Sequence, residues 1–292
     1  MTTMNDMIND TRRTVYGTMN DQINILSDSN LAAATTFKMD LDISGITPGV
    51  TLSSGLNVWY VKGSNAATNE VFVIPSYGGS PAVATTAGDI VFIRPRSTNW
   101  QLFGMINDEI NRMSTPTTGL FQIKQWTTIV NATYQTYDVP VTDAMEIVRV
   151  RYRMPGTPNV WFDLRPMSWK WVTGQTQQRI QLLHAIPSGT DIQFVYKAPF
   201  SKATSVTDNV VTTCGLSESM LDIPVLGASV SLMQTTEMRR NQVQQQGDSR
   251  RSDEVTTGGN ANAASMMRKQ YDERMNNEYA RLIRQMPIFR GI

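Results

Sequence analysis

Side chains that could do catalytic chemistry are few in this sequence and show no catalytic spacing. The chain has one cysteine, Cys214, and one histidine, His184, so catalytic triads and histidine-rich metal sites lack their raw material. We expect an inert, half-buried thiol at Cys214 and, at His184, an imidazole on a strand that is packed or has a cross-strand partner. Asp40 and Asp42 lie two residues apart on an expected strand, where paired carboxylates can do acid–base work, but a solvated surface pair is the simpler interpretation.

The composition excludes several classes of function. No phosphate-binding loop, nucleophile elbow or His-Glu-x-x-His motif occurs in the 292 residues, so we expect no enzymatic activity, no metal and no cofactor. The formal net charge of +1 indicates no general attraction to nucleic acid or to a membrane surface. One cysteine excludes an internal disulfide and fits a reducing compartment. No apolar run reaches the ~18 residues of a membrane span, and residues 1–14 lack the apolar core of a signal peptide. We therefore expect synthesis in a cytoplasm and no membrane partner.

One expected strand carries a stripe of three arginines. Over residues 145–154, Arg149, Arg151 and Arg153 alternate with apolar side chains, so the guanidinium groups share one face. They repel one another unless water, salt or an acidic partner compensates. One interpretation is contact with an acidic neighbouring protein or with DNA phosphates, which bind arginine through charge-assisted hydrogen bonds. The other is a solvated outer face. DNA is the lesser option, since no sequence-specific recognition motif is present. The apolar members of the alternation are Ile147, Val150, Tyr152 and Met154.

The first third of the chain changes from a helical to a β pattern. Residues 1–26 are predicted to form an N-terminal helix, because apolar residues recur at three-, four- and seven-residue spacings. Residues 27–97 then contain short β segments separated by turn residues. This spacing favours a small β-barrel, since closing a sheet removes its exposed edges. The repeating apolar residues are Met4, Ile8, Val15, Met19, Ile23 and Leu26, and the expected strands cover 35–43, 50–52, 56–62, 70–74 and 90–93.

The middle of the chain predicts a second β domain behind a central helix. Residues 98–116 have an apolar stripe, and Thr98 and Gln101 have the spacing of a capping box. Residues 117–205 return to longer, aromatic-rich strands, which predicts a sandwich-like domain. The predicted fold class is α+β. It comprises helical bundle elements with two inserted antiparallel β domains, a small barrel and a sandwich-like domain, and an extended C-terminal helical arm.

The C-terminal third is predicted to be helical. A helix over 206–246 is followed by a polar, glycine-containing linker at 247–262 and by a last amphipathic helix at 263–292. Left in water, the apolar stripe of that helix would be a solubility hazard, and methionine-rich faces adapt to irregular grooves. We therefore expect a partner protein to cover the stripe. The alternative is a hairpin in which this helix folds back on the preceding one.

Short motifs spread over most of the chain follow one another in a recognisable order. They are Thr-Arg-Arg at 11–13, Gly-Ile-Thr-Pro-Gly at 45–49, Tyr-Gly-Gly-Ser-Pro-Ala at 77–82, Arg-Pro-Arg at 94–96, Lys-Ala-Pro-Phe at 197–200, Leu-Gly-Ala at 226–228 and Glu-Met-Arg-Arg at 237–240. With the order of the elements, they resemble the head-to-tail adaptor (connector, or neck) proteins of tailed bacteriophages.

The resemblance implies a structural role in the neck of the virion, after synthesis in the host bacterial cytoplasm. Adaptors of this kind form a ring, expected here to contain twelve copies, beneath the portal protein. Further neck or tail proteins bind the ring, and DNA meets it only as the passing genome. The C-terminal segment would dock on the portal, and the residues expected in that contact are Met267, Tyr271, Met275, Tyr279, Leu282, Ile283, Arg284, Met286, Phe289 and Arg290.

Two other functions stay open at this point. The chain could be a different structural protein of the particle, such as a head-completion, tail-tube or decoration protein. It could also bind glycans, because aromatic side chains form platforms for sugars, although the same residues serve equally as core anchors. The tryptophans that prompt this alternative are Trp59, Trp126, Trp161, Trp169 and Trp171.

Overall fold

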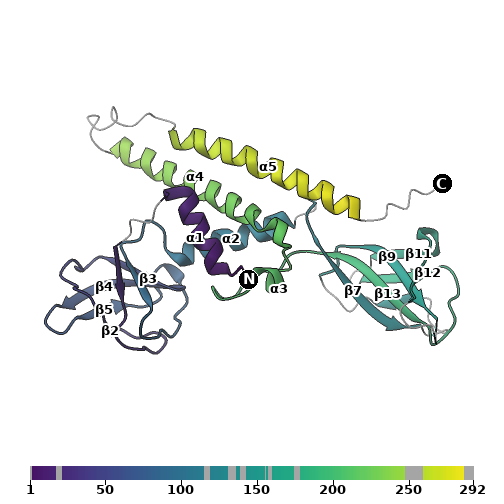
Figure 1. Ribbon diagram of the computed structural model, residues 1–292, viewed down its shortest axis with the longest axis horizontal. Helices are drawn as coiled ribbons and strands as arrows, with labels where there is room; N and C mark the ends of the chain where they lie inside the picture. The colour runs from purple at the N-terminus through teal and green to yellow at the C-terminus, as the bar shows by residue number, and fades with distance from the viewer. Residues whose placement is uncertain are drawn as a thin grey trace. The chain divides into compact units, whose positions relative to one another are not determined.

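A computed structural model describes most of the chain, and its fold is α+β, as predicted (Figure 1). The chain divides into two compact units, Met1–Ile110 with Lys202–Arg274, and Asn111–Ser201 with Met275–Ile292. The described residues are 2–17, 22–114, 119–130, 136–138, 143–154, 156, 160–173, 178–246 and 259–285.

The helices come from both ends and from the middle of the chain. Three short 3-10 turns accompany them, at Tyr77–Gly79, Pro166–Ser168 and Glu218–Met220. The predicted capping box at the central helix is confirmed, because the Thr98 amide donates to the Gln101 side chain and the Gln101 amide to the Thr98 hydroxyl, both at 3.2 Å. The helices are α1 (Met4–Tyr16), α2 (Asn99–Met113), α3 (Val210–Cys214), α4 (Asp222–Gln246) and α5 (Gly259–Gln285).

Helix α1 is shorter than the spacing of its apolar residues predicts. It ends at Gly17, whose φ of 71° is unfavourable for residues with a Cβ and whose amide donates to the Arg13 carbonyl at 2.9 Å. The predicted helix over 1–26 is therefore wrong at Gln22–Ile25, which form a strand. Ile23 lies in a strand instead, because the 22–25 segment pairs with the last strand of the barrel.

The first β domain is a six-stranded antiparallel sheet whose two edge strands meet. Backbone amides of Ser27 and Asp40 donate to Lys38 and Ile25 at 3.0 and 2.9 Å, and this closes the sheet into the predicted small barrel. The strand expected at 35–43 extends only over Thr36–Lys38. The order is β1-β6-β3-β4-β5-β2, with β1 (Gln22–Ile25), β2 (Thr36–Lys38), β3 (Thr51–Ser54), β4 (Asn57–Asn65), β5 (Glu70–Ile74) and β6 (Ile90–Ile93).

The second β domain contains two antiparallel sheets around one core. Phe194 is fully buried at its centre and stacks on Trp126 with ring centroids 4.8 Å apart. Ile180 and Leu182 of the smaller sheet share this core, which gives the sandwich-like layering that the sequence predicts. The sheets are β10-β9-β13-β7 and β11-β12-β8, with β7 (Gln122–Ile129), β8 (Thr136–Asp138), β9 (Glu146–Arg153), β10 (Phe162–Asp163), β11 (Trp169–Thr173), β12 (Gln178–Leu182) and β13 (Asp191–Ala198).

A bulge in β9 explains the spacing of its apolar residues. Val195 pairs with Arg149 and Tyr196 pairs with Ile147, so Val148 has no opposite residue on β13. An extra residue shifts the alternation by one position. Ile147 and Val150, which regular alternation would place on opposite faces, are consequently both buried.

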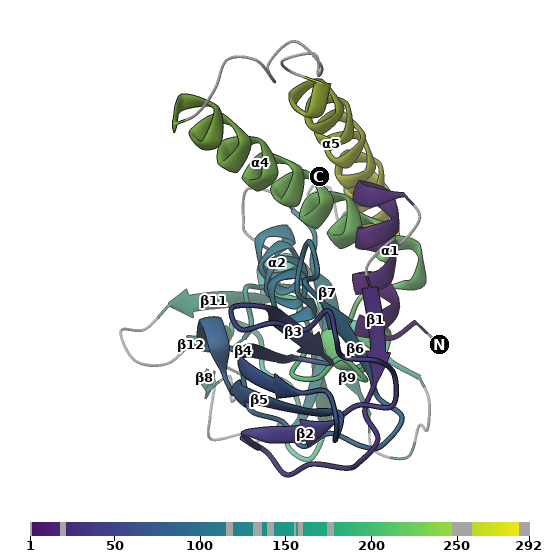
Figure 2. The same ribbon diagram turned by 90° about the vertical axis from the view of Figure 1, so that its left-hand side faces the viewer.

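Hydrogen bonds join α1 and α2 to the loop over residues 203–208. Helix α1 packs on α4, and the amides of Met4 and Asn5 donate to the carbonyls of Asp208 and Val206 at 3.0 and 2.9 Å (Figure 2). The Asn107 side chain of α2 makes two hydrogen bonds to the backbone of Ala203, at 3.1 and 2.8 Å. The bundle is therefore held by buried amides as well as by apolar packing.

Candidate interaction surfaces

The start of α4 and the middle of α5 are joined by one arginine. Arg274 of α5 donates to the Asp222 carboxylate at 2.6 and 2.9 Å and to the Ser219 carbonyl at 2.8 Å. Asp222 lies in the first turn of α4, where a carboxylate also interacts favourably with the helix dipole. Helix α5 therefore returns to the beginning of α4, which is the hairpin alternative (Figures 1 and 2).

The expectation that the α5 stripe is free for another protein is wrong for its centre. Tyr271, Met275 and Leu282 are only 3%, 6% and 7% exposed within the single chain. The amphipathic pattern indicated that this face is buried, but such a pattern does not show which polypeptide covers it. Tyr279, at 40% exposure, is the stripe residue most open to solvent among those described. Arg284 is exposed and Met267 and Ile283 are half-buried, whereas Met286, Phe289 and Arg290 lie outside the described residues.

Tyr279 packs against a glycine that the sequence analysis did not single out. A Cβ built on Gly119 would lie 2.4 Å from Tyr279 Cε2, and Gly119 has a φ of +74°. Any side chain at this position would thus displace the ring and strain the backbone. The close approach fixes one face of Tyr279, and the other part of the ring stays accessible.

The arginine stripe of β9 is compensated inside its own domain. Arg149 and Arg151 lie 3.6 and 3.1 Å from the Asp163 carboxylate of β10, and Arg153 pairs with Asp191 of β13. The repulsion that called for an outside acid is thus relieved by carboxylates on the neighbouring strands. Sequence reasoning missed them because Asp163 and Asp191 become neighbours of β9 only through sheet pairing.

The nucleophile and base candidates have different surroundings. Cys214 is fully buried, and burial, followed by the nearby Asp208 charge, raises the pKa of its thiol to about 11, so the thiolate is scarce at neutral pH. The expected packed imidazole is wrong, because His184 is exposed in a bend after β12. Asp40 and Asp42 lie beyond the end of β2, not on a strand, and are exposed as expected. Among the described residues, no cluster of three or more His, Cys, Asp or Glu side chains could hold a metal ion.

The tryptophans are largely core residues. Trp59 is 5% exposed and packs on Phe37, and Trp126 stacks on Phe194. Trp161 and Trp169 are half-buried, and Arg153 lies over the Trp161 ring at 5.2 Å. The Trp171 side chain lies outside the described part. An open aromatic platform for sugars is therefore not formed by the described tryptophans.

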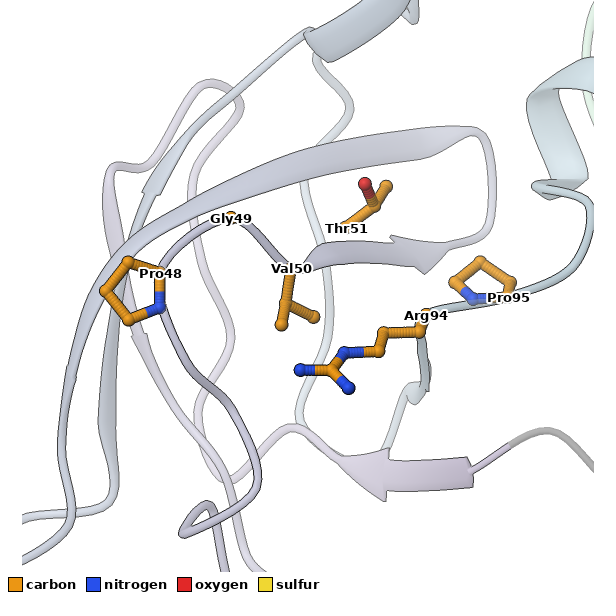
Figure 3. A pocket seen from close by; sticks show the side chains of 6 residues that line it. All are labelled: Pro48, Gly49, Val50, Thr51, Arg94 and Pro95. Carbon is orange, nitrogen blue, oxygen red and sulfur yellow. The ribbon is translucent and has the colours of Figure 1, made fainter. Parts of the chain in front are cut away.

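Two adjoining hollows on the barrel form a surface that the sequence analysis did not predict as a site. The larger, of about 420 Å³, contains Arg94, and the smaller, of about 210 Å³, contains Arg96 and Trp100. Both are lined by Thr51 and Pro95, so the two hollows adjoin, and together they are called the basic groove. Figure 3 shows the larger hollow, with Arg94 beside Val50. The Arg-Pro-Arg motif at 94–96 is the feature of the sequence that could have indicated this groove.

Comparison with known proteins adds little to this description. No helix in the described ranges combines the length and the apolar character that membrane crossing requires. No family model matches the chain, and no curated protein matches its sequence. A chain from a solved structure of the neck of an empty GTA particle, computed with C6 symmetry, is 15% identical to this one. The match covers 58% of this chain and 75% of that chain, at a TM-score of 0.23.

Proposed function

We propose that this protein is a non-enzymatic, ring-forming adaptor between the portal and the tail in the neck of a tailed bacteriophage particle. The observation that carries the proposal is architectural. Helix α1 packs on α4, Arg274 of α5 binds Asp222 at the start of α4, and two antiparallel β domains are inserted between the helices along the chain. This is the arrangement that the resemblance to head-to-tail adaptors implies.

The chemistry of the described residues supports a structural role. The Cys214 thiol is buried and has a raised pKa, His184 is exposed, and Asp40 and Asp42 are solvated. The polar groups that are buried, such as Asn107, bind backbone atoms of other segments. Buried polar contacts of this kind specify one packing arrangement rather than catalyse a reaction.

The portal contact is proposed for the end of α5 and the residues after it. Tyr271 and Met275 are already covered by the chain itself, so they are not proposed to bind the portal. The exposed side chains of Tyr279 and Arg284 remain available on the last turns of α5. Repetition of a weak contact around a ring multiplies its effect through effective concentration.

Imaging of the purified particle tests the main proposal. Density for this chain should lie directly beneath the portal, in twelve copies. Many copies along the tail or on the capsid surface would identify a tail-tube or decoration protein instead. Turnover of any small substrate would contradict the non-enzymatic role.

A truncation tests the portal contact without disturbing the core. Removing residues 286–292 and replacing Arg284→Glu should weaken binding of the chain to purified portal rings while the melting temperature stays unchanged. Lys269→Glu is the matched control, since Lys269 is an exposed cation of the same helix outside the apolar stripe. Unchanged portal affinity of the truncated Arg284→Glu chain would refute docking through this end.

A further inference from the structure

The basic groove combines two cations with apolar and aromatic walls. Arg94 and Arg96 flank Pro95, and Tyr77 and Trp100 line the smaller hollow. The two arginines are exposed, and the described residues that line the groove include no carboxylate. The groove therefore fits a segment in which an apolar side chain lies between acidic ones.

The backbone of the groove has unusual conformations on both sides. Arg94 has a φ of 50° and Ser76, next to Tyr77, has a φ of 55°. Non-glycine residues in this region are uncommon and strained, and such strain concentrates at binding sites. The Arg94 amide donates to the Thr51 carbonyl at 2.9 Å, and its guanidinium donates to the Thr47 hydroxyl at 3.3 Å, so the arginine is held in place.

The same barrel presents a loop of the complementary composition. Asp40, Leu41 and Asp42 are all exposed, and Leu41 keeps 50% of its surface in contact with water. This segment, residues 40–42, is called the acidic loop. It places one leucine between two carboxylates, as the groove places one proline between two guanidinium groups.

Buried Asn24 fixes the acidic loop before any partner binds. Its side-chain oxygen accepts from the Leu41 amide at 3.0 Å, and its side-chain nitrogen donates to the carbonyls of Leu41 and Asp42 at 3.2 and 3.4 Å. Asp42 accepts two hydrogen bonds from Ser44, and these lower the pKa of its carboxyl, which keeps it charged. A preformed loop loses little conformational entropy on binding, so its contact is stronger than that of a flexible one.

We infer that the acidic loop of one copy of this chain binds in the basic groove of the next copy. Leu41 would pack against Pro95 and Trp100, while the two carboxylates would face Arg94 and Arg96. The inference rests on the proposed ring and names the contact that closes it. Because the two surfaces differ, the contact is head-to-tail, and repeated contacts of this kind generate a ring when the rotation closes.

Charge reversal of the full chain tests this contact on purified portal rings, with native mass spectrometry as the readout. The groove variant carries Arg94→Glu and Arg96→Glu, and the loop variant carries Asp40→Arg and Asp42→Arg. Each alone should need roughly tenfold more protein to complete the ring. An equal mixture should restore assembly, because the reversed groove fits the reversed loop in alternating copies. Lys62→Glu, at an exposed barrel cation outside the groove, should change nothing.

A third variant removes the apolar anchor and leaves every charge in place. Leu41→Ser should weaken ring completion roughly tenfold, because the docked loop loses the apolar side chain that packs in the groove. Circular dichroism melting of each variant establishes that the barrel is folded. The variant also separates a specific contact from general charge attraction, which would be insensitive to this change.

The outcomes separate the contact from the proposed function. Unchanged ring formation by both charge-reversal variants would overturn the contact and leave the adaptor proposal standing. Weakening by each variant without recovery in the mixture would also overturn it, since the two surfaces would then bind something other than one another. Failure of the unaltered chain to form a ring, alone or on the portal, would overturn both proposals.

Discussion

In the barrel, the first and last strands of the sheet are joined by backbone hydrogen bonds at Ser27 and Asp40, whereas β7 of the second β domain pairs with β13 on one side. The barrel has a Lys38–Glu70 pair at 4.0 Å, whereas Arg153, Lys197 and Lys124 of the second domain form close ion pairs with carboxylates. The difference teaches that one domain is stabilised by closure around its core and the other also by charge pairing across its strands.

The largest expected effect comes from the core of the second β domain. Phe194→Ala should lower the unfolding free energy of that domain by about 3–5 kcal/mol, because it opens a cavity beneath Trp126. Hydrogen exchange followed by mass spectrometry should show lost protection in residues 122–198 and none in the barrel. Phe72→Ala, at a 40% exposed barrel position, is the control. Equal loss of protection in the barrel would show that the two domains do not unfold independently.

The next effect concerns the point where the chain leaves the barrel. Buried Arg12 donates to the Ser97 carbonyl at 3.1 Å and to Asn99, and it lies over the Phe92 ring at 4.6 Å. Arg12→Met should destabilise the first unit by about 2–4 kcal/mol, since buried acceptors lose a charged donor.

Urea unfolding measures the effect of Arg12→Met, and its neighbour provides the matched control. Arg13 has a side chain that is 71% exposed, so Arg13→Met should change the midpoint hardly at all. If the two substitutions were equally mild, the barrel would be attached to the helices by apolar packing alone.

A smaller effect tests the charge pairing of the second domain. Asp191→Asn should destabilise that domain by about 0.5–1 kcal/mol at low salt, because Arg153 loses its partly exposed carboxylate. High salt should shrink the difference by screening. Glu70→Gln in the barrel should show neither effect, since its pair with Lys38 is long and open. If the loss of stability caused by Asp191→Asn did not depend on salt, the carboxylate would act through hydrogen-bond geometry rather than through its charge.

The smallest effect concerns the segment by which the chain returns from the second β domain to the helices. Amides of Thr204 and Ser205 donate to the Asp208 carboxylate at 2.8 and 2.9 Å and lower its pKa. Because the pKa of Asp208 is lower in the folded state, its charged form stabilises the fold at pH values above the unfolded pKa of about 3.9. This stability is lost as the pH falls through the folded pKa. Asp208→Asn should therefore make thermal stability less dependent on pH below about 4. If the melting temperature of the variant still fell with pH in the same way, other carboxylates would be responsible for the loss of stability in acid.

Local signals predicted the elements that depend on local interactions. The capping box at Thr98 and the strands ending at Ile74 and Ile93 were read correctly, because side-chain periodicity and turn residues decide them. The end of α1 was predicted wrongly. The apolar spacing continues past Gly17, but residues 22–25 pair with β6 instead of extending the helix.

The candidate surfaces were less predictable because partners distant in sequence decide them. The pattern of α5 identified Tyr271 and Met275 as a buried face, but their cover comes from the chain itself. The alternation in β9 predicted that its arginines share one face. Asp163 and Asp191 become their neighbours only because β10 and β13 pair with β9, which the local sequence does not show. The basic groove requires β3 and the segment after β6 to meet, which no local pattern encodes.

The attachment of α1 to the far end of the chain has a consequence for synthesis on the ribosome. Met4, Met7 and Ile8 are buried in the finished protein, and the segments that bind the N-terminus and cover α1 lie about two hundred residues later, from Val206 into α4. At about 5–20 residues per second, translation leaves this helix without these later segments for roughly ten to forty seconds, although Ser97, which binds Arg12, is made earlier. Both β domains emerge during that interval, so the nascent chain must keep its first helix shielded or unfolded until the last third arrives.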